Sequence, residues 1–235
     1  MKFKLPEEHF FLTEEESDLI SQKVINLKSK WISREGFYTL GAASYLDSRD
    51  IDVYKKLSDN SNVILRKEFE SVYDKIKSFF ELKLGKPVKF DLAWPGFHIF
   101  EFNKQFSEMK NTQYIASIHV DKPYSNHDWG FEVNEEETFS FTIPVRIPKN
   151  GAGLNCFNTE TGRNYIEFYN SPNELQEQLL ASKNRIDYIN GNLYYHEFGL
   201  LHQISNDSPL THGDMRITIQ GHGVLCHNEY YNIFF

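Results

Sequence analysis

Cysteine is scarce in this sequence, because the 235 residues include only Cys156 and Cys226. Two cysteines cannot form the disulfide framework of a small secreted domain, and such low usage is typical of a reducing compartment. The sequence also lacks an apolar run long enough for a signal peptide or a membrane span. Together these absences predict a cytoplasmic protein that has no membrane partner.

Basic residues are also few. Lys and Arg number 25 and Asp and Glu number 33, so the formal net charge is −8. Proteins that bind nucleic acid by displacing phosphate counterions need a basic surface. The charge balance therefore argues against a nucleic-acid partner and leaves a small molecule as the expected one.

Aromatic residues, in contrast, are abundant, with 20 Phe, 13 Tyr and 3 Trp. The 40% hydrophobic and 25% charged content is that of a folded chain rather than a disordered one. So many rings indicate either a large core or a cavity lined by rings. Because no linker-like segment divides the chain, we expect a single domain over residues 1–235.

The first part of the chain has a helical pattern. Thr13 and Glu16 have capping-box spacing, and apolar residues then recur at helical intervals. A second helix is predicted over residues 63–82, where glycine and proline follow the last apolar position. We therefore expect residues 1–90 to form a mainly helical support.

From residue 88 onward the pattern changes to short apolar runs separated by turn residues. The predicted strands are 97–102, 114–120, 139–147, 153–157, 164–169, 186–189, 192–196, 202–205, 216–221 and 230–235. One short helix is predicted at 173–184. Helices followed by many short strands predict an α+β fold that is mainly β, with a barrel or sandwich buttressed by N-terminal helices.

Residues suited to metal binding occur in the strand-rich half. His119 and Asp121 lie two positions apart on a predicted strand, so both side chains project to one side. His202 follows a segment that begins with glycine, and Arg216 comes fourteen positions after it. Two histidines and a carboxylate on one face of a metal leave open positions opposite, as in non-haem Fe(II) oxygenases.

This pattern resembles that of the Fe(II)- and 2-oxoglutarate-dependent dioxygenases of the double-stranded β-helix superfamily. The family pattern is His-x-Asp, a distal histidine and then an arginine or lysine, often followed at the second position by serine or threonine. The matching residues here are His119, Asp121, His202, Arg216 and Thr218. Residues 191–204 are also similar to the pair of strands that carries the family's distal histidine.

The resemblance implies a double-stranded β-helix (jelly-roll) core over residues 91–235, and an enzyme that uses Fe(II), 2-oxoglutarate and O2. The two histidines and Asp121 would bind the iron. Because Asp121 is a carboxylate, where halogenating relatives have a small residue, hydroxylation is expected instead of halogenation. Desaturation, epoxidation and ring formation stay open as alternatives. The expected substrate is a small polar metabolite such as a free amino acid or a derivative, and succinate and CO2 are released.

The resemblance also implies how 2-oxoglutarate is held. Arg216 would bind its distal carboxylate as a bidentate fork, which lysine reproduces less well. Thr218 lies on the same strand face and would donate to the same carboxylate. Asn155 has two interpretations: it contacts the 1-carboxylate of 2-oxoglutarate, or it caps a turn.

Further side chains are candidates for the substrate pocket or compete for the metal. The candidate substrate contacts are Tyr124, Trp129, His98, His222 and Gln220. For the two strand histidines among them, a packed core position is the alternative. His127 is interpreted as part of a polar loop at the pocket mouth. His196 is interpreted as a packed histidine rather than a metal ligand.

Two other functions fit part of the pattern. A cupin-type isomerase, or a dioxygenase independent of 2-oxoglutarate, would use His119, His196 and His202 and would not need Arg216. A barrel-fold binding module without catalysis would need no metal. The presence of both Asp121 and Arg216 argues against the binding module.

Overall fold

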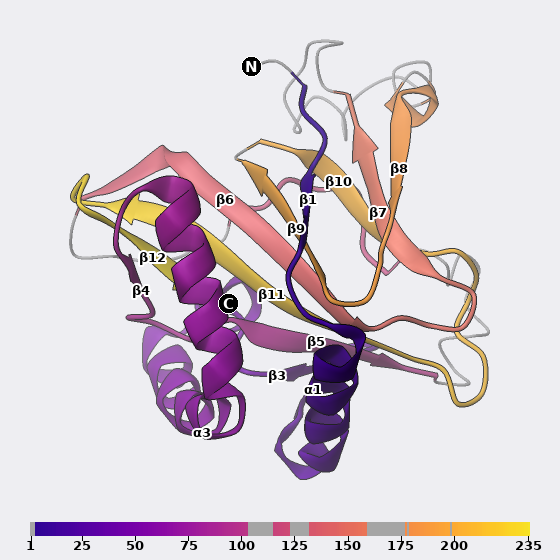
Figure 1. The fold of residues 1–235 in the computed structure, drawn as a ribbon, viewed down its shortest axis with the longest axis horizontal. Coiled ribbons are helices and arrows are strands. Elements are labelled where there is room, and N and C mark those ends of the chain that lie inside the picture. Colours follow the sequence, from indigo (N-terminus) through magenta and orange to yellow (C-terminus); the bar gives the residue numbers. More distant parts are fainter. Residues whose placement is uncertain (1–2, 103–114, 123–131, 159–176, 178, 198) are drawn as a thin grey trace.

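The computed structural model describes residues 3–102, 115–122, 132–158, 177, 179–197 and 199–235. Within these ranges two β-sheets are formed. Helices α1 and α3 lie on one side of the larger sheet, and the smaller sheet lies on the other (Figure 1). Runs that alternate apolar and polar side chains explain this layering, because each face of a strand packs against a different partner.

The larger sheet has nine strands in the described part of the chain, in the order β1-β9-β6-β11-β5-β3-β2, and β12 pairs with both β11 and β4. Their bounds are β1 Glu7–Phe10, β2 Ile32–Ser33, β3 Tyr38–Leu40, β4 Val88–Lys89, β5 Gly96–Glu101, β6 Val133–Arg146, β9 Asn192–Glu197, β11 Met215–Cys226 and β12 Tyr230–Phe234. The smaller sheet consists of β10 (Leu201–Asn206), β7 (Ala152–Phe157) and β8 (Lys183–Asp187), in that order.

Helix α1 (Glu14–Asn26) begins with the predicted capping box. The Glu16 backbone N–H donates to Thr13 Oγ1 at 3.1 Å, and the Thr13 N–H donates to Glu16 Oε2 at 2.9 Å. A short 3-10 helix η1 (Lys28–Lys30) and helix α2 (Ser44–Asp47) follow before α3. No helix in the described ranges combines the length and the apolar character that a membrane span requires.

Helix α3 (Ile51–Leu84) starts twelve residues earlier than the sequence predicted and is kinked at Phe69. Its first half is rich in Ser, Asn and Asp, which have poor helical propensity, so the pattern there is weak. Tertiary contacts compensate for this. The Asn62 side chain donates to Leu92 O at 2.9 Å and accepts from the Trp94 N–H at 2.9 Å.

Most predicted strands are present, with shifted ends. The predicted strand 114–120 is wrong in its described part, where an isolated bridge pairs His119 with His202. The predicted strand 164–169 lies outside the described residues. Of the predicted helix 173–184, the described residues 177 and 179–181 are helical, whereas residues 183–184 begin β8. Residues 1–90 add four short strands, β1 to β4, which the sequence did not predict.

The main core lies between the helices and the larger sheet. Phe80 of α3 is fully buried, and its ring lies 4.7 Å from that of Phe139 and 4.9 Å from that of Phe141, measured between centroids. Ile217 and Ile219 of β11 belong to the same buried cluster. The alternate side chains of β11 therefore project from the opposite face of the sheet, away from the helices.

The packing of α3 can be tested with a matched pair of substitutions. Phe80→Ala should lower the free energy of unfolding by about 3–5 kcal/mol, because it removes a buried ring and leaves a cavity. Leu82→Ala on the same helix should change it by less than about 0.5 kcal/mol, because Leu82 is 88% exposed. Urea denaturation measures both. Equal effects would contradict the packing of α3 on the sheet.

Candidate metal centre and cavity

Two backbone hydrogen bonds bring the two predicted histidine ligands together. The His119 N–H donates to His202 O, and the His202 N–H donates to His119 O, both at 2.9 Å. The centroids of the two imidazoles are 4.4 Å apart. Asp121 follows two residues later, with Oδ1 3.5 Å from His119 Nε2 and Oδ2 3.7 Å from His202 Nε2. The three residues therefore form one cluster, with all three ligand atoms within 4.8 Å of one another.

The donor set of this cluster fits a divalent metal. His119 Nδ1 donates to Ser117 O at 2.7 Å, and His202 Nδ1 donates to Leu200 O at 3.1 Å. These bonds select the tautomer in which each Nε2 presents a lone pair toward Asp121. Burial lowers the pKa of His202 to about 3, so that ring is neutral.

Asp121 needs a cationic partner at this position. Its Oδ2 is buried and has no hydrogen-bond partner. Burial by itself would raise the pKa of Asp121, but the surrounding histidines hold it well below its ordinary value, so the group is a carboxylate. A carboxylate that faces imidazole lone pairs is unfavourable unless a cation lies among them. The separations of 3.5 and 3.7 Å suit ligands that share one ion at about 2.0–2.2 Å from each.

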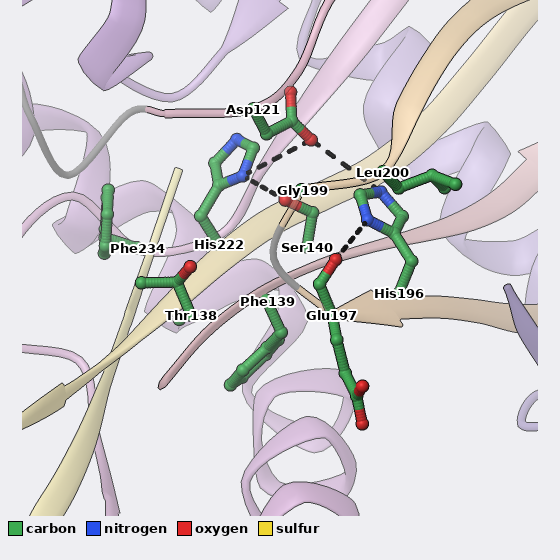
Figure 2. A pocket seen from close by; sticks show the side chains of 11 residues that line it. Asp121, Thr138, Phe139, Ser140, His196, Glu197, Gly199, Leu200, His222 and Phe234 are labelled. Carbon is green, nitrogen blue, oxygen red and sulfur yellow. Dashed lines mark hydrogen bonds and ion pairs between the residues drawn. The ribbon is translucent and has the colours of Figure 1, made fainter. Parts of the chain in front are cut away.

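Two more histidines lie beside Asp121 (Figure 2). His196 Nε2 is 3.8 Å and His222 Nδ1 is 3.9 Å from Asp121 Oδ2. His222 Nδ1 shares a hydrogen bond of 2.8 Å with Ser140 Oγ. These side chains line a cavity of about 10 Å³, about the size of one water molecule. They surround the carboxylate, but among the described residues the three-ligand cluster does not include them.

A larger cavity of about 540 Å³ is lined by both His119 and Asp121. Strand β11 contributes alternate side chains to this cavity, as its parity predicted: Arg216, Thr218, Gln220 and His222. His98 also lines it, so the structure places three of the five candidate substrate contacts there. The other two, Tyr124 and Trp129, lie outside the described residues, as does His127.

Arg216 is a buried charge without an acidic partner among the described residues. It is 2% exposed, and the guanidinium carbon lies 5.3 Å from the centroid of the Tyr188 ring. Its Nη1 donates to Ser205 O at 3.3 Å, but its Nε has no partner. In the described part of the chain no carboxylate forms an ion pair with it. Burial lowers its pKa to about 10, which leaves it charged at neutral pH. This arrangement fits an incoming carboxylate.

Asn155 does not line the cavity. On β7 it pairs with Gln203, the residue after His202, so its side chain projects from the opposite face of the small sheet. Its Nδ2 donates to Gln203 Oε1 at 3.3 Å. The sequence interpretation that Asn155 contacts 2-oxoglutarate therefore has no support from this position, because the strand register turns the side chain away.

Several lining residues were missed by the sequence analysis. Phe37, Tyr45 and Leu46 come from the N-terminal part, which was interpreted as helical support. The N-terminal segment contains no motif that would have identified them, because β3 brings them to the cavity by pairing with β5. His196 was interpreted as a packed core residue. It is half-buried, and it also lies against Asp121.

No protein-family model and no curated protein sequence matches the chain. Solved structures do match it. One is an N-substituted L-amino acid dioxygenase from Burkholderia ambifaria AMMD in complex with alpha-ketoglutarate, with a TM-score of 0.55 and 13% identity, covering 97% of this chain and 85% of that one. Another is the non-heme alpha-ketoglutarate-dependent epimerase SnoN from nogalamycin biosynthesis, with a TM-score of 0.53 and 10% identity, covering 93% of this chain and 78% of that one.

A further structure of SnoN, in complex with Fe3+, alpha-ketoglutarate and nogalamycin RO, matches with a TM-score of 0.52 and 10% identity, covering 89% of this chain and 74% of that one. At such low identity these likenesses establish the fold. The chain has the double-stranded β-helix fold of the non-haem iron, 2-oxoglutarate-dependent oxygenases, and at the level of the fold this confirms the resemblance found in the sequence.

Proposed function

We propose that the protein is an Fe(II)- and 2-oxoglutarate-dependent oxygenase that acts on a small molecule. The observation that carries this proposal is that one cavity is lined by two members of the His-Asp-His cluster and by a buried guanidinium without a carboxylate. A metal alone would account for the first feature but not for the second. A dicarboxylate that chelates the metal and extends to Arg216 accounts for both.

Each residue has a distinct task in this proposal. His119, Asp121 and His202 hold the iron by two imidazole nitrogens and one carboxylate oxygen. Arg216 and Thr218 bind the distal carboxylate of 2-oxoglutarate and so fix its orientation. When bound, iron and 2-oxoglutarate supply the means to activate O2 for oxidation of a substrate C–H bond, with release of succinate and CO2.

The cavity volume of about 540 Å³ suits a small-molecule substrate beside 2-oxoglutarate. Hydroxylation of a free amino acid or a derivative is the reaction to test first. A structural neighbour described as an N-substituted L-amino acid dioxygenase supports this choice loosely. Because another neighbour is an epimerase, products should be identified as well as counted. The cupin-type alternative needs His196 as a ligand, and the geometry favours Asp121 in that place.

The metal assignment predicts that wild-type protein forms succinate from 2-oxoglutarate with Fe(II) and O2, even without a substrate. His202→Ala should abolish this turnover, because it removes a metal ligand. Loss of a residue that only supports a metal ligand weakens metal binding by about 10- to 100-fold. Because His202 is itself a ligand, its loss should weaken metal binding by more than that. Succinate formation and metal titration measure the two effects.

The control for this experiment is His212→Ala, which removes an exposed histidine outside the cavity. It should leave both quantities unchanged. If His202→Ala retained wild-type succinate formation and metal affinity, the iron site would be wrongly assigned.

The role of Arg216 predicts a selective defect in binding of 2-oxoglutarate. Arg216→Lys keeps the charge but loses the bidentate fork, so the KM for 2-oxoglutarate should rise by about 10- to 100-fold. Metal affinity, measured without 2-oxoglutarate, should not change. Arg146→Lys on the neighbouring strand β6, outside the cavity lining, is the control. An unchanged KM in Arg216→Lys would contradict the assignment.

A further inference from the structure

Part of the large cavity has an aromatic wall, formed by Phe37, Tyr45, Leu46, His98 and Phe100. The Phe37 and Phe100 rings are stacked, with centroids 5.1 Å apart and planes at 19°. Phe37 also lies 5.6 Å from the His98 ring. Phe37 and Phe100 cover one face of each other, and the aromatic surface that the wall leaves toward the cavity favours an apolar ring.

The wall is held rigidly by contacts behind it. Arg34 donates to both carboxylate oxygens of Asp47, at 2.7 and 2.6 Å, and its Nε donates to Thr39 Oγ1 at 3.1 Å. The Asp47 carboxylate also accepts from the Ala43 N–H at 2.9 Å, at the start of α2. These bonds fix α2, and therefore Tyr45, against β3. A surface held in this way loses little freedom when a ligand binds.

Tyr45 gives the wall one hydrogen-bonding group that reaches a ligand. Its hydroxyl shares a hydrogen bond of 2.8 Å with His98 Nε2. A phenolic hydroxyl can donate one hydrogen bond and accept others. Whichever of the two groups donates, the Tyr45 hydroxyl can still form at least one further hydrogen bond. Tyr45 lines the cavity and is 40% exposed.

The wall carries no formal charge. Its five residues include no acid, lysine or arginine, and burial lowers the pKa of His98 to about 3, so that ring is neutral. The nearest acidic group on α2, Asp47, is already paired with Arg34. Once 2-oxoglutarate occupies Arg216 and a metal occupies Asp121, an ammonium or carboxylate placed against this wall would lose hydration without gaining a counter-charge. The wall therefore discriminates against charged groups.

We propose that the aromatic wall binds an uncharged aromatic ring that bears a hydroxyl group, with the ring against Phe37 and Phe100 and the hydroxyl on Tyr45. That this ring belongs to the substrate rests on the proposed oxygenase function. That the wall binds such a ring does not depend on that function. The metal cluster and Arg216 line the same cavity, so a ring held by the wall shares the space in which oxidation would occur.

The test uses four probes that share one ring: phenol, toluene, benzylammonium and benzoate. Their affinities are measured at neutral pH by ligand-observed NMR on protein loaded with Zn(II) and 2-oxoglutarate, which cannot turn over. On metal-free protein only phenol and toluene are compared, because Asp121 and Arg216 are then open to the charged probes. Phenol should bind about three- to tenfold more tightly than toluene, which is the effect of one net hydrogen bond. Both charged probes should bind more weakly than toluene.

Two substitutions separate the hydrogen bond from the stacking. Tyr45→Phe should remove the advantage of phenol over toluene and leave toluene binding unchanged. Phe37→Leu should weaken phenol and toluene alike. The matched control is Tyr38→Phe, because Tyr38 packs against Trp31 and does not line the cavity. Thermal unfolding of each variant verifies that it is folded.

The outcomes distinguish this inference from the oxygenase proposal. Equal affinity for phenol and toluene, a preference for a charged probe, or phenol binding that Tyr45→Phe leaves unaltered would overturn the ring site. Succinate formation that depends on Fe(II) would then still support the oxygenase. Conversely, preference for phenol that depends on Tyr45, in protein that forms no succinate, would support the ring site and contradict the oxygenase.

Discussion

The architecture depends on the alternation of side chains along strand β11. Ile217 and Ile219 belong to the core between the sheet and the helices, whereas Arg216 and Thr218 line the cavity on the other face. Because successive side chains of a strand point to opposite sides, one segment both anchors the fold and builds the site. A shift of one residue in its pairing would place the arginine in the helix core and the isoleucines in the cavity.

The second constraint is electrostatic. Asp121 and Arg216 are buried charges. Among the described residues, no lysine or arginine forms an ion pair with Asp121, and no carboxylate forms one with Arg216. Burial of an unpaired charge is costly, so the core of helices and sheet must stabilise these groups. The same cost favours ligands of opposite charge, a metal cation at Asp121 and a carboxylate at Arg216. The two charges therefore connect the stability of the fold to its proposed chemistry.

The N-terminal segment does more than support the strand-rich core, because it also contributes residues to the site. Pairing of β3 with β5 and the bonds between Arg34 and Asp47 hold Tyr45 at the cavity. The strand-rich core supplies the metal cluster and Arg216, and the N-terminal segment supplies part of the aromatic wall. In the proposed enzyme the reaction is therefore set by the core, and the choice of substrate is set in part by residues that precede it.

The sequence by itself identified His119, Asp121, His202 and Arg216 as candidates, through their spacing and the family resemblance that this spacing supports. The bridge between His119 and His202 then brings the three candidate ligands together. The alternation of β11 was also predictable, because it depends on spacing along a single segment. The start of α3 was not, because its first half relies on contacts that Asn62 makes with residues thirty positions away.

Only the tertiary structure decided which other side chains meet at the site. The register between β7 and β10 turns Asn155 away from the cavity, while the pairing of β9 in the large sheet brings His196 beside Asp121. Tyr45 reaches the cavity through a short helix that carries no recognisable motif. Each of these positions depends on pairing between distant segments, and the free energy of that pairing comes from burial of the whole core rather than from local sequence.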